Sequence, residues 1–279
     1  MRRKAMRILG GIVVAGVSAG LNLGVMPAGA TDVGDLGSSS AVERMSKNPR
    51  LAPELERLLG STPGYVPAPP IYFRPNPYPA ASLRDYATPR LAKREADAQH
   101  PGIERLFVES PAMRRVVQVQ VQHAKDRSKP APMLYLLDGV TAPKESGWLR
   151  EGNVQQLSGE QVTVVMPTEA SGSNYANWQA DDPLLGRMQW ETFLTRELPT
   201  VLEQEADLKF NGGRYLGGAS MGAGAAVRLA SLYPDRYRGT FGLSGCYSTT
   251  SNMGREFLNM VVAAGAGNPH NQWGAGTSA

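Results

Sequence analysis

The pentapeptide from Gly218 to Gly222 reads Gly-Ala-Ser-Met-Gly and sets one serine between two glycines. This spacing is typical of a nucleophilic serine on a tight strand-to-helix turn, because a side chain at either glycine would collide with the reversing backbone. Residues 213–217 are a strand candidate before the turn, and residues 223–232 favour a helix after it. The alternative is a serine in an ordinary turn, since the chain holds 31 glycines. The strand–turn–helix context favours Ser220 as a nucleophile.

A serine hydroxyl attacks a carbonyl carbon at neutral pH only when a base takes its proton and hydrogen-bond donors hold the oxyanion that forms. The backbone amide of Met221, the residue after the serine, is one expected donor. The second donor is expected from the loop that follows a strand at residues 133–137, where Gly139 allows a close approach of the backbone. The sequence therefore predicts an oxyanion hole made by the amides of Val140 and Met221.

Strands and helices alternate along the part of the chain that must carry these groups. An antiparallel pair at the start is followed by apolar strands and amphipathic helices, which predicts an α/β fold with a mixed, largely parallel sheet and helices on both faces. The expected strands are 103–110, 114–123, 133–137, 161–166, 213–217 and 238–243, and the expected helices are 190–203, 223–232 and 252–264.

The first thirty residues read as a secretory signal peptide. A basic head precedes an apolar stretch at residues 8–25, and the small residues from Ala28 to Ala30 form a cleavage site. An uncleaved membrane anchor is the alternative, but the stretch is short and glycine-rich for a span. We expect cleavage after Ala30 and a secreted protein of the cell envelope.

Residues 31–100 are expected to be an N-terminal extension that is rich in proline and partly helical. A charged stretch at residues 83–99 is read within it as a helix candidate. The α/β domain is then expected at residues 101–279, and no apolar run after the leader is long enough to cross a bilayer.

Charge and cysteine content exclude two classes of protein. The four basic residues of the leader account for the whole formal net charge of +4, so the rest of the chain gives no indication of nucleic-acid binding. One cysteine, Cys246, leaves no intramolecular disulfide to stabilise the fold. It follows a strand candidate and is expected to be a buried, small apolar residue.

Several segments together resemble the mycolyltransferases of the antigen 85 family, which are esterase-like α/β-hydrolases. The run from Trp190 to Pro199, which reads Trp-Glu-Thr-Phe-Leu-Thr-Arg-Glu-Leu-Pro, is far more specific than the pentapeptide around the serine. The other matching segments are 134–139, 164–167, 173–178, Ser220–Met221 and 272–274. The resemblance covers the chain from about residue 103 to its last residues.

The resemblance implies an α/β-hydrolase fold and assigns a role to each site residue. Ser220 would accept the acyl group, the amides of Val140 and Met221 would form the oxyanion hole, and Asp138 would hydrogen-bond the sugar hydroxyls of trehalose. Members of the family move a mycolyl chain from one trehalose mycolate to another, or to cell-wall arabinogalactan, through a mycolyl-serine. The resemblance implies no metal and no organic cofactor.

Two features depart from the family pattern. Thr141 stands where the family usually carries an arginine that helps to bind the sugar. The family's catalytic acid and histidine lie beyond the segment that matches 271–274, so we expect an incomplete domain whose last strands, acid and base are missing. His270 precedes that segment and is not expected to be the base, while His100 and His123 are expected at the solvated surface.

Two other functions stay open on the sequence. A secreted carboxylesterase would use water in place of the sugar as the acceptor. A non-catalytic envelope protein would bind glycolipids without turnover, and the missing acid and histidine favour this second alternative.

Overall fold

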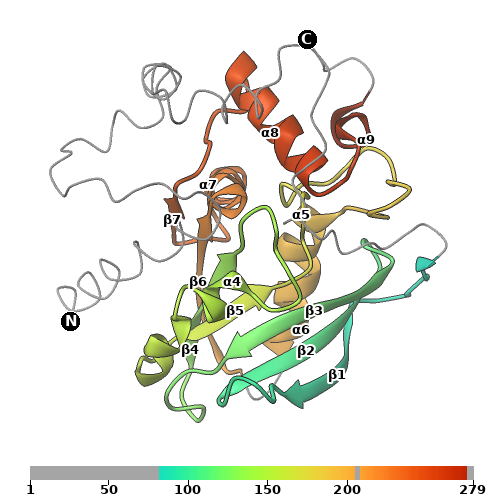
Figure 1. The fold of residues 1–279 in the computed structure, drawn as a ribbon. Coiled ribbons are helices and arrows are strands. Elements are labelled where there is room, and N and C mark those ends of the chain that lie inside the picture. Colours follow the sequence, from blue (N-terminus) through green and yellow to red (C-terminus); the bar gives the residue numbers. More distant parts are fainter. Residues whose placement is uncertain (1–81, 205–207, 275–279) are drawn as a thin grey trace, which may run out of the picture.

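A computed structural model describes residues 82–204 and 208–274, and its centre is a mixed seven-stranded sheet (Figure 1). The strand order is β1-β2-β3-β5-β4-β6-β7. The strands are β1 (Arg90–Ala96), β2 (Ile103–Ser110), β3 (Arg115–Gln122), β4 (Ala131–Leu137), β5 (Thr163–Pro167), β6 (Phe210–Ala219) and β7 (Gly239–Leu243). Neighbours from β1 to β5 pair antiparallel, and neighbours from β5 to β7 pair parallel.

Helices lie on both faces of this sheet. They are α4 (Gly147–Arg150), the 3-10 helix η3 (Val154–Gly159), α5 (Trp190–Thr192), the π-helical turn η4 (Phe193–Glu197), α6 (Leu198–Gln204), α7 (Met221–Leu232), α8 (Asn252–Ala264) and α9 (Pro269–Trp273). Trp148 of α4 packs with Leu136 in one core cluster, whereas Trp190 and Leu229 pack with Tyr135 in the other. Successive residues of β4 thus point to opposite apolar layers, as expected of a central strand. The predicted α/β-hydrolase fold is confirmed.

Residues 90–96 correct the expectation of a helix in the charged stretch. They form β1 at the edge of the sheet and pair with β2. Arg90 contacts Glu109 at 2.5 Å, and Arg94 contacts Glu104 at 2.6 Å. Opposite charges that face each other across two strands stabilise the pair. Read without its partner strand, the charged sequence of β1 resembles that of a solvent-exposed helix. The sheet therefore includes residues expected to belong to the N-terminal extension at residues 31–100.

The expected leader and most of the expected extension, residues 1–81, lie outside the described residues. Within residues 82–204 and 208–274, no helix is long and apolar enough to span a bilayer.

Candidate active site

Ser220 stands on the sharp turn between β6 and α7. Its backbone has φ 52° and ψ −117°, a conformation that costs free energy for any residue with a side chain and that is typical of functional turns. A Cβ on Gly218 would lie 2.1 Å from the carbonyl oxygen of Gly222, and a Cβ on Gly222 would lie 2.3 Å from the carbonyl oxygen of Leu137. Both flanking glycines are thus required by close backbone approaches, as the spacing predicts.

The loop after β4 lies against this turn. A Cβ on Gly139 would lie 3.5 Å from the Cβ of Ser220, so the two backbones meet without a side chain between them. The carbonyl oxygen of Val140 accepts hydrogen bonds from the amide of Gly172 at 3.0 Å and from Ser171 Oγ at 3.2 Å. These bonds fix the Val140 peptide plane.

Neither predicted oxyanion donor is engaged elsewhere in the described part of the chain. The amides of Val140 and Met221 donate to no acceptor among residues 82–204 and 208–274. The oxyanion hole that these two amides would form beside Ser220 remains a prediction.

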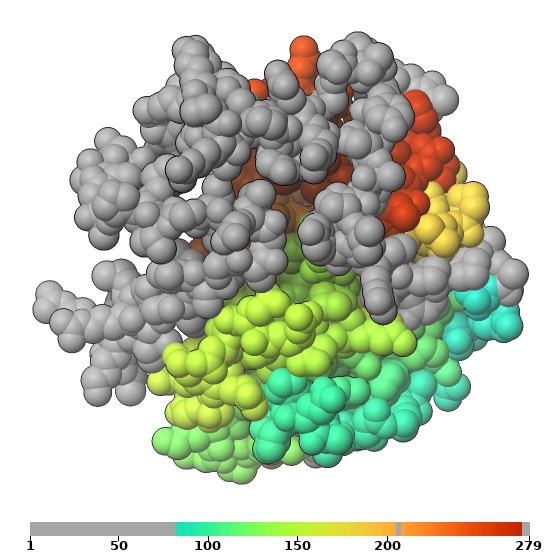
Figure 2. All heavy atoms as spheres, in the orientation of Figure 1, coloured from blue at the N-terminus to red at the C-terminus, as the bar shows by residue number. Residues whose placement is uncertain are grey.

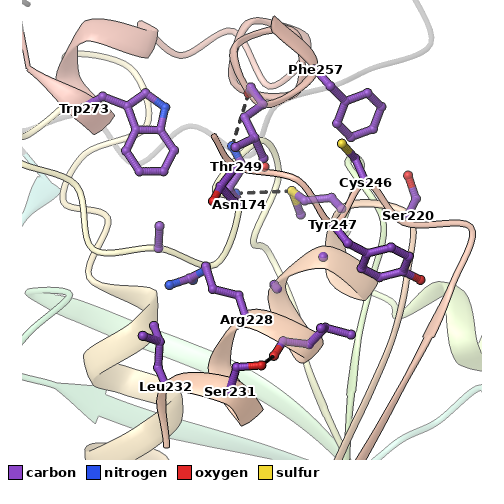
Figure 3. Close-up of a pocket in the computed structure, with 16 residues that line it drawn as sticks. Asn174, Ser220, Arg228, Ser231, Leu232, Cys246, Tyr247, Thr249, Phe257 and Trp273 are labelled. Atoms are coloured by element: carbon purple, nitrogen blue, oxygen red, sulfur yellow. Dashed lines mark hydrogen bonds between the residues drawn. The ribbon is translucent and has the colours of Figure 1, made fainter. Parts of the chain in front are cut away.

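A pocket of about 260 Å³ opens beside Ser220 and runs along α7 (Figure 3). Its walls come from α7, the segment after β7, α8, α9 and the loop before α5. Apolar side chains dominate this lining, with Arg228 as a charged exception. The lining residues are Asn174, Ala176, Ser220, Met221, Gly224, Ala225, Val227, Arg228, Ser231, Leu232, Cys246, Tyr247, Thr249, Phe257, Leu258 and Trp273.

Cys246 corrects another expectation. Its thiol is partly exposed rather than buried in the core, and it lies in the pocket near Ser220 (Figure 3). The segment after β7 does not enter the core because it turns over the start of α7. A Cβ on Gly224 would lie 2.7 Å from the carbonyl oxygen of Cys246.

The loop before α5 braces the pocket through two residues with positive φ, Asn174 and Tyr175. Asn174 Nδ2 donates to the carbonyl oxygen of Leu258 in α8 at 3.2 Å and to Gln272 Oε1 in α9 at 3.1 Å. Arg228 of α7 donates to the carbonyl oxygen of Tyr175 at 2.8 Å. The sequence marks this loop only by its family resemblance, although asparagine is among the residues that tolerate positive φ best.

Asp138 is buried at the end of β4. Its Oδ1 accepts a hydrogen bond from Ser146 Oγ at 3.1 Å, and its own amide donates to the hydroxyl of Tyr175 at 2.9 Å. Burial raises the pKa of the Asp138 carboxyl to about 7, although hydrogen bonds from Ser146 and from the amides of Gly147 and Trp148 oppose the shift. Among the described residues, Oδ2 has no hydrogen-bond partner. Its role in binding a sugar stays a prediction.

We expect Asp138→Asn to remove a pH dependence of folding stability. Between the ordinary pKa of 3.8 and about 7, the folded chain keeps a proton on Asp138 that the unfolded chain has lost. The unfolded state binds fewer protons there, so the free energy of unfolding falls as pH rises through this window and levels off above it. Between pH 4 and pH 8, the free energy of unfolding of the variant should rise relative to that of wild type by on the order of 3 kcal/mol.

Guanidinium unfolding of both proteins at four pH values between 4 and 8 measures this difference. If the free energies of unfolding of wild type and Asp138→Asn change in parallel with pH, the Asp138 carboxyl keeps its ordinary pKa in the folded state.

All three histidines lie away from the lining of the pocket. His123 Nε2 contacts Glu104 Oε2 at 2.7 Å, and burial lowers the pKa of this imidazole. Its side chain is 10% exposed, which corrects the expected surface position. His100 contacts Glu145 at 2.6 Å, and His270 is exposed on α9. Among residues 82–204 and 208–274, the pocket lining includes no histidine and no carboxylate that could serve Ser220 as a base.

Comparison with known proteins identifies a family. The family model described as "Putative esterase" matches residues 110–278. The MPT51 antigen of Mycobacterium leprae is 34% identical over 188 residues, which cover 66% of this chain and 59% of that protein. The diacylglycerol acyltransferase/mycolyltransferase Ag85A of the same organism is 33% identical over 183 residues, which cover 63% of this chain and 54% of that protein. The chain thus spans little more than half the length of these curated relatives.

Two solved structures share the fold. The crystal structure of MPT51 (FbpC1) from Mycobacterium tuberculosis has a TM-score of 0.56 and 31% sequence identity, with 63% of each chain covered. An S-formylglutathione hydrolase from Agrobacterium tumefaciens has a TM-score of 0.52 and covers 67% of this chain and 69% of its own. Its sequence identity of 16% supports likeness of fold alone.

Proposed function

The chain belongs to the esterase family, and from that premise we propose that it transfers an acyl group through an ester of Ser220. One observation carries the proposal. The hydroxyl sits on a turn with positive φ, at the end of an apolar pocket and against the Gly139 backbone. Strain at this position is retained where the surrounding fold enforces it, and it is typical of a nucleophile.

The proposed reaction has two halves. Ser220 Oγ attacks the carbonyl carbon of an acyl ester, and the oxyanion that forms accepts hydrogen bonds from the amides of Val140 and Met221. The ester C–O bond then breaks, and the serine proton ends on the oxygen of the departing alcohol. In the second half the hydroxyl of an acceptor attacks the acyl-serine carbonyl carbon, the bond between that carbon and Ser220 Oγ breaks, and the acceptor's proton returns to Ser220 Oγ.

We propose a long-chain acyl donor and a sugar acceptor. The lining of the pocket is mainly apolar, which suits an alkyl chain. A relative at 33% identity is named a diacylglycerol acyltransferase/mycolyltransferase, which supports a mycolyl or similar group as cargo. Trehalose glycolipids or cell-wall arabinogalactan would be donor and acceptor, Asp138 would bind the sugar, and the cell envelope would be the site of action.

A second candidate function is glycolipid binding without turnover. It is favoured by the described pocket lining, in which no histidine or carboxylate is available to take the serine proton. Binding and oxyanion stabilisation do not need that base, whereas a fast attack by serine does.

Product analysis with the full chain separates these functions. The chain is incubated with a long-chain trehalose monoester and isotope-labelled trehalose, and products are identified by mass spectrometry. Labelled trehalose ester supports the proposal, and free fatty acid alone indicates a carboxylesterase. Binding of the monoester by calorimetry with no product indicates the non-catalytic protein. If neither a product nor binding of the monoester is found, both candidate functions are rejected.

A further inference from the structure

A chain of buried side chains links the turn after β1 to the loop beside Ser220. Asp97 Oδ2 accepts a hydrogen bond from Gln120 Nε2 at 3.1 Å. Gln120 Oε1 accepts from the amide of Ser146 at 2.8 Å. Ser146 Oγ in turn donates to Asp138 Oδ1 at 3.1 Å. Gln120 and Ser146 are fully buried, so these bonds face no competition from water.

Asp97 sets the direction of every hydrogen bond along this path of side chains. Burial alone would raise the pKa of Asp97, but hydrogen bonds from Arg105, Gln99 and other donors outweigh it and lower that pKa. An ionised carboxylate only accepts, so the amide of Gln120 must turn its NH₂ group toward Asp97 and its oxygen toward Ser146.

The last hydrogen bond of this path, from Ser146 to Asp138, has a defined direction for the same reason. Ser146 Oγ accepts a hydrogen bond from the amide of Trp148 at 3.2 Å, and its single proton is left for Asp138. One arrangement of donors and acceptors is therefore defined along the whole path.

This path holds one end of the loop at residues 138–146, and the fold braces the same end twice more. His100 Nε2 contacts Glu145 Oε1 at 2.6 Å, and Gln118 Nε2 donates to the carbonyl oxygen of Lys144 at 2.5 Å. Figure 2 shows residues of β1 and β2 beside those of α4 and η3 on one face, and Gln155 Nε2 donates to the carbonyl oxygen of Pro101 at 3.2 Å. The other end of the loop reaches Ser220 through Gly139.

We propose that Asp97 and Gln120 are positioning residues that set the place of the Val140 amide relative to Ser220. The inference rests on the proposed function and deepens it, because it assigns a task to residues that touch no substrate. Asp97 also lies outside the residues matched by the esterase family model, which begins at residue 110. A segment that precedes the matched region would then support the oxyanion hole.

The test compares Gln120→Met with Gln122→Met. Both glutamines lie on β3 and are buried, but neither polar atom of the Gln122 side chain has a partner among the described residues. Each substitution removes a buried side-chain amide, but only Gln120→Met removes the hydrogen bonds that link Asp97 to Ser146. Asp97→Asn is the second variant, since it keeps the volume while the bond directions become ambiguous.

Two readouts decide the outcome. We expect kcat for acyl transfer to fall about ten-fold in Gln120→Met with KM within two-fold of wild type, because a displaced oxyanion donor weakens the transition state alone. Hydrogen exchange at Gly172, whose amide donates to Val140, should accelerate in Gln120→Met and, to a smaller extent, in Asp97→Asn. Gln122→Met should match wild type in both measurements.

Equal values of kcat and of exchange at Gly172 for the Gln120 and Gln122 variants would overturn the inference. A wild-type chain with no Ser220-dependent transfer would reject the proposed function instead. The exchange experiment would still decide whether Gln120 positions the loop, because it needs no turnover.

Discussion

Replacing Ser220 by alanine is expected to abolish covalent labelling of the chain by a fluorophosphonate. The serine hydroxyl attacks the phosphorus of the probe and displaces fluoride, and the phosphoryl oxygen then occupies the oxyanion hole. Ser220 is presented at the end of the pocket, beside the predicted donors of Val140 and Met221. Mass spectrometry of tryptic peptides should find the tag on the peptide that contains Ser220 and no tag in the variant.

Ser244→Ala is a matched control for this experiment. Ser244 also has a positive φ, 54° against 52° for Ser220, so alanine replaces a serine with a similar φ at both sites. Ser244 is exposed and lies outside the pocket lining. Its variant should label as wild type does. Labelling that survives in Ser220→Ala would remove the nucleophile from the proposed reaction.

The rate of labelling carries further information. Enzymes that lose their base keep an enhancement of about 10³–10⁴ over water from the oxyanion hole and from binding. The described pocket lining offers Ser220 no histidine. Slow, Ser220-dependent labelling is therefore expected, and it would be compatible with either candidate function.

Local signals made most of the fold predictable. The expected strand at 103–110 and the expected helix at 252–264 agree with β2 and α8 to the residue, because alternation and helical periodicity depend on near neighbours. The two glycines around Ser220 predicted the turn for the same reason. The resemblance to the antigen 85 family is confirmed by the relatives. Glu191 in its most specific run contacts Arg228 at 2.6 Å and thereby ties α5 to α7.

Features that depend on distant partners could not be predicted in this way. β1 is a strand because Glu104 and Glu109 of β2 face its arginines. The link from Asp97 through Gln120 to Ser146 joins residues far apart in sequence. Each is an ordinary polar residue in its own segment, and only the register of the sheet brings them together.

Gly222→Ala is expected to destabilise the folded chain. A Cβ at this position would lie 2.3 Å from the carbonyl oxygen of Leu137 and 2.6 Å from that of Asp138. Alanine would gain up to about 1 kcal/mol of helix propensity in α7. The contacts are with backbone atoms that no rotamer change can move, so α7 must shift away from β4. Overpacking of this kind costs about 1–3 kcal/mol or more, and we expect it to prevail.

Gly159→Ala supplies the matched control, since a Cβ on Gly159 would meet nothing within 4 Å. This variant should be neutral or gain about 0.4–1 kcal/mol, because alanine restricts the unfolded chain more than glycine does. Urea unfolding measures both changes. A stability for Gly222→Ala equal to that of Gly159→Ala would show that α7 does not press against the end of β4.

The same shift should also reach the chemistry. Leu137 and Asp138 lead directly to the Val140 amide, while the Met221 amide stands at the start of α7, so moving α7 from β4 separates the two predicted donors. Gly222→Ala should therefore label more slowly with the fluorophosphonate even below its unfolding transition, while Gly159→Ala labels at the wild-type rate. If Gly222→Ala loses stability but keeps the labelling rate, the two amides do not act together on one oxyanion.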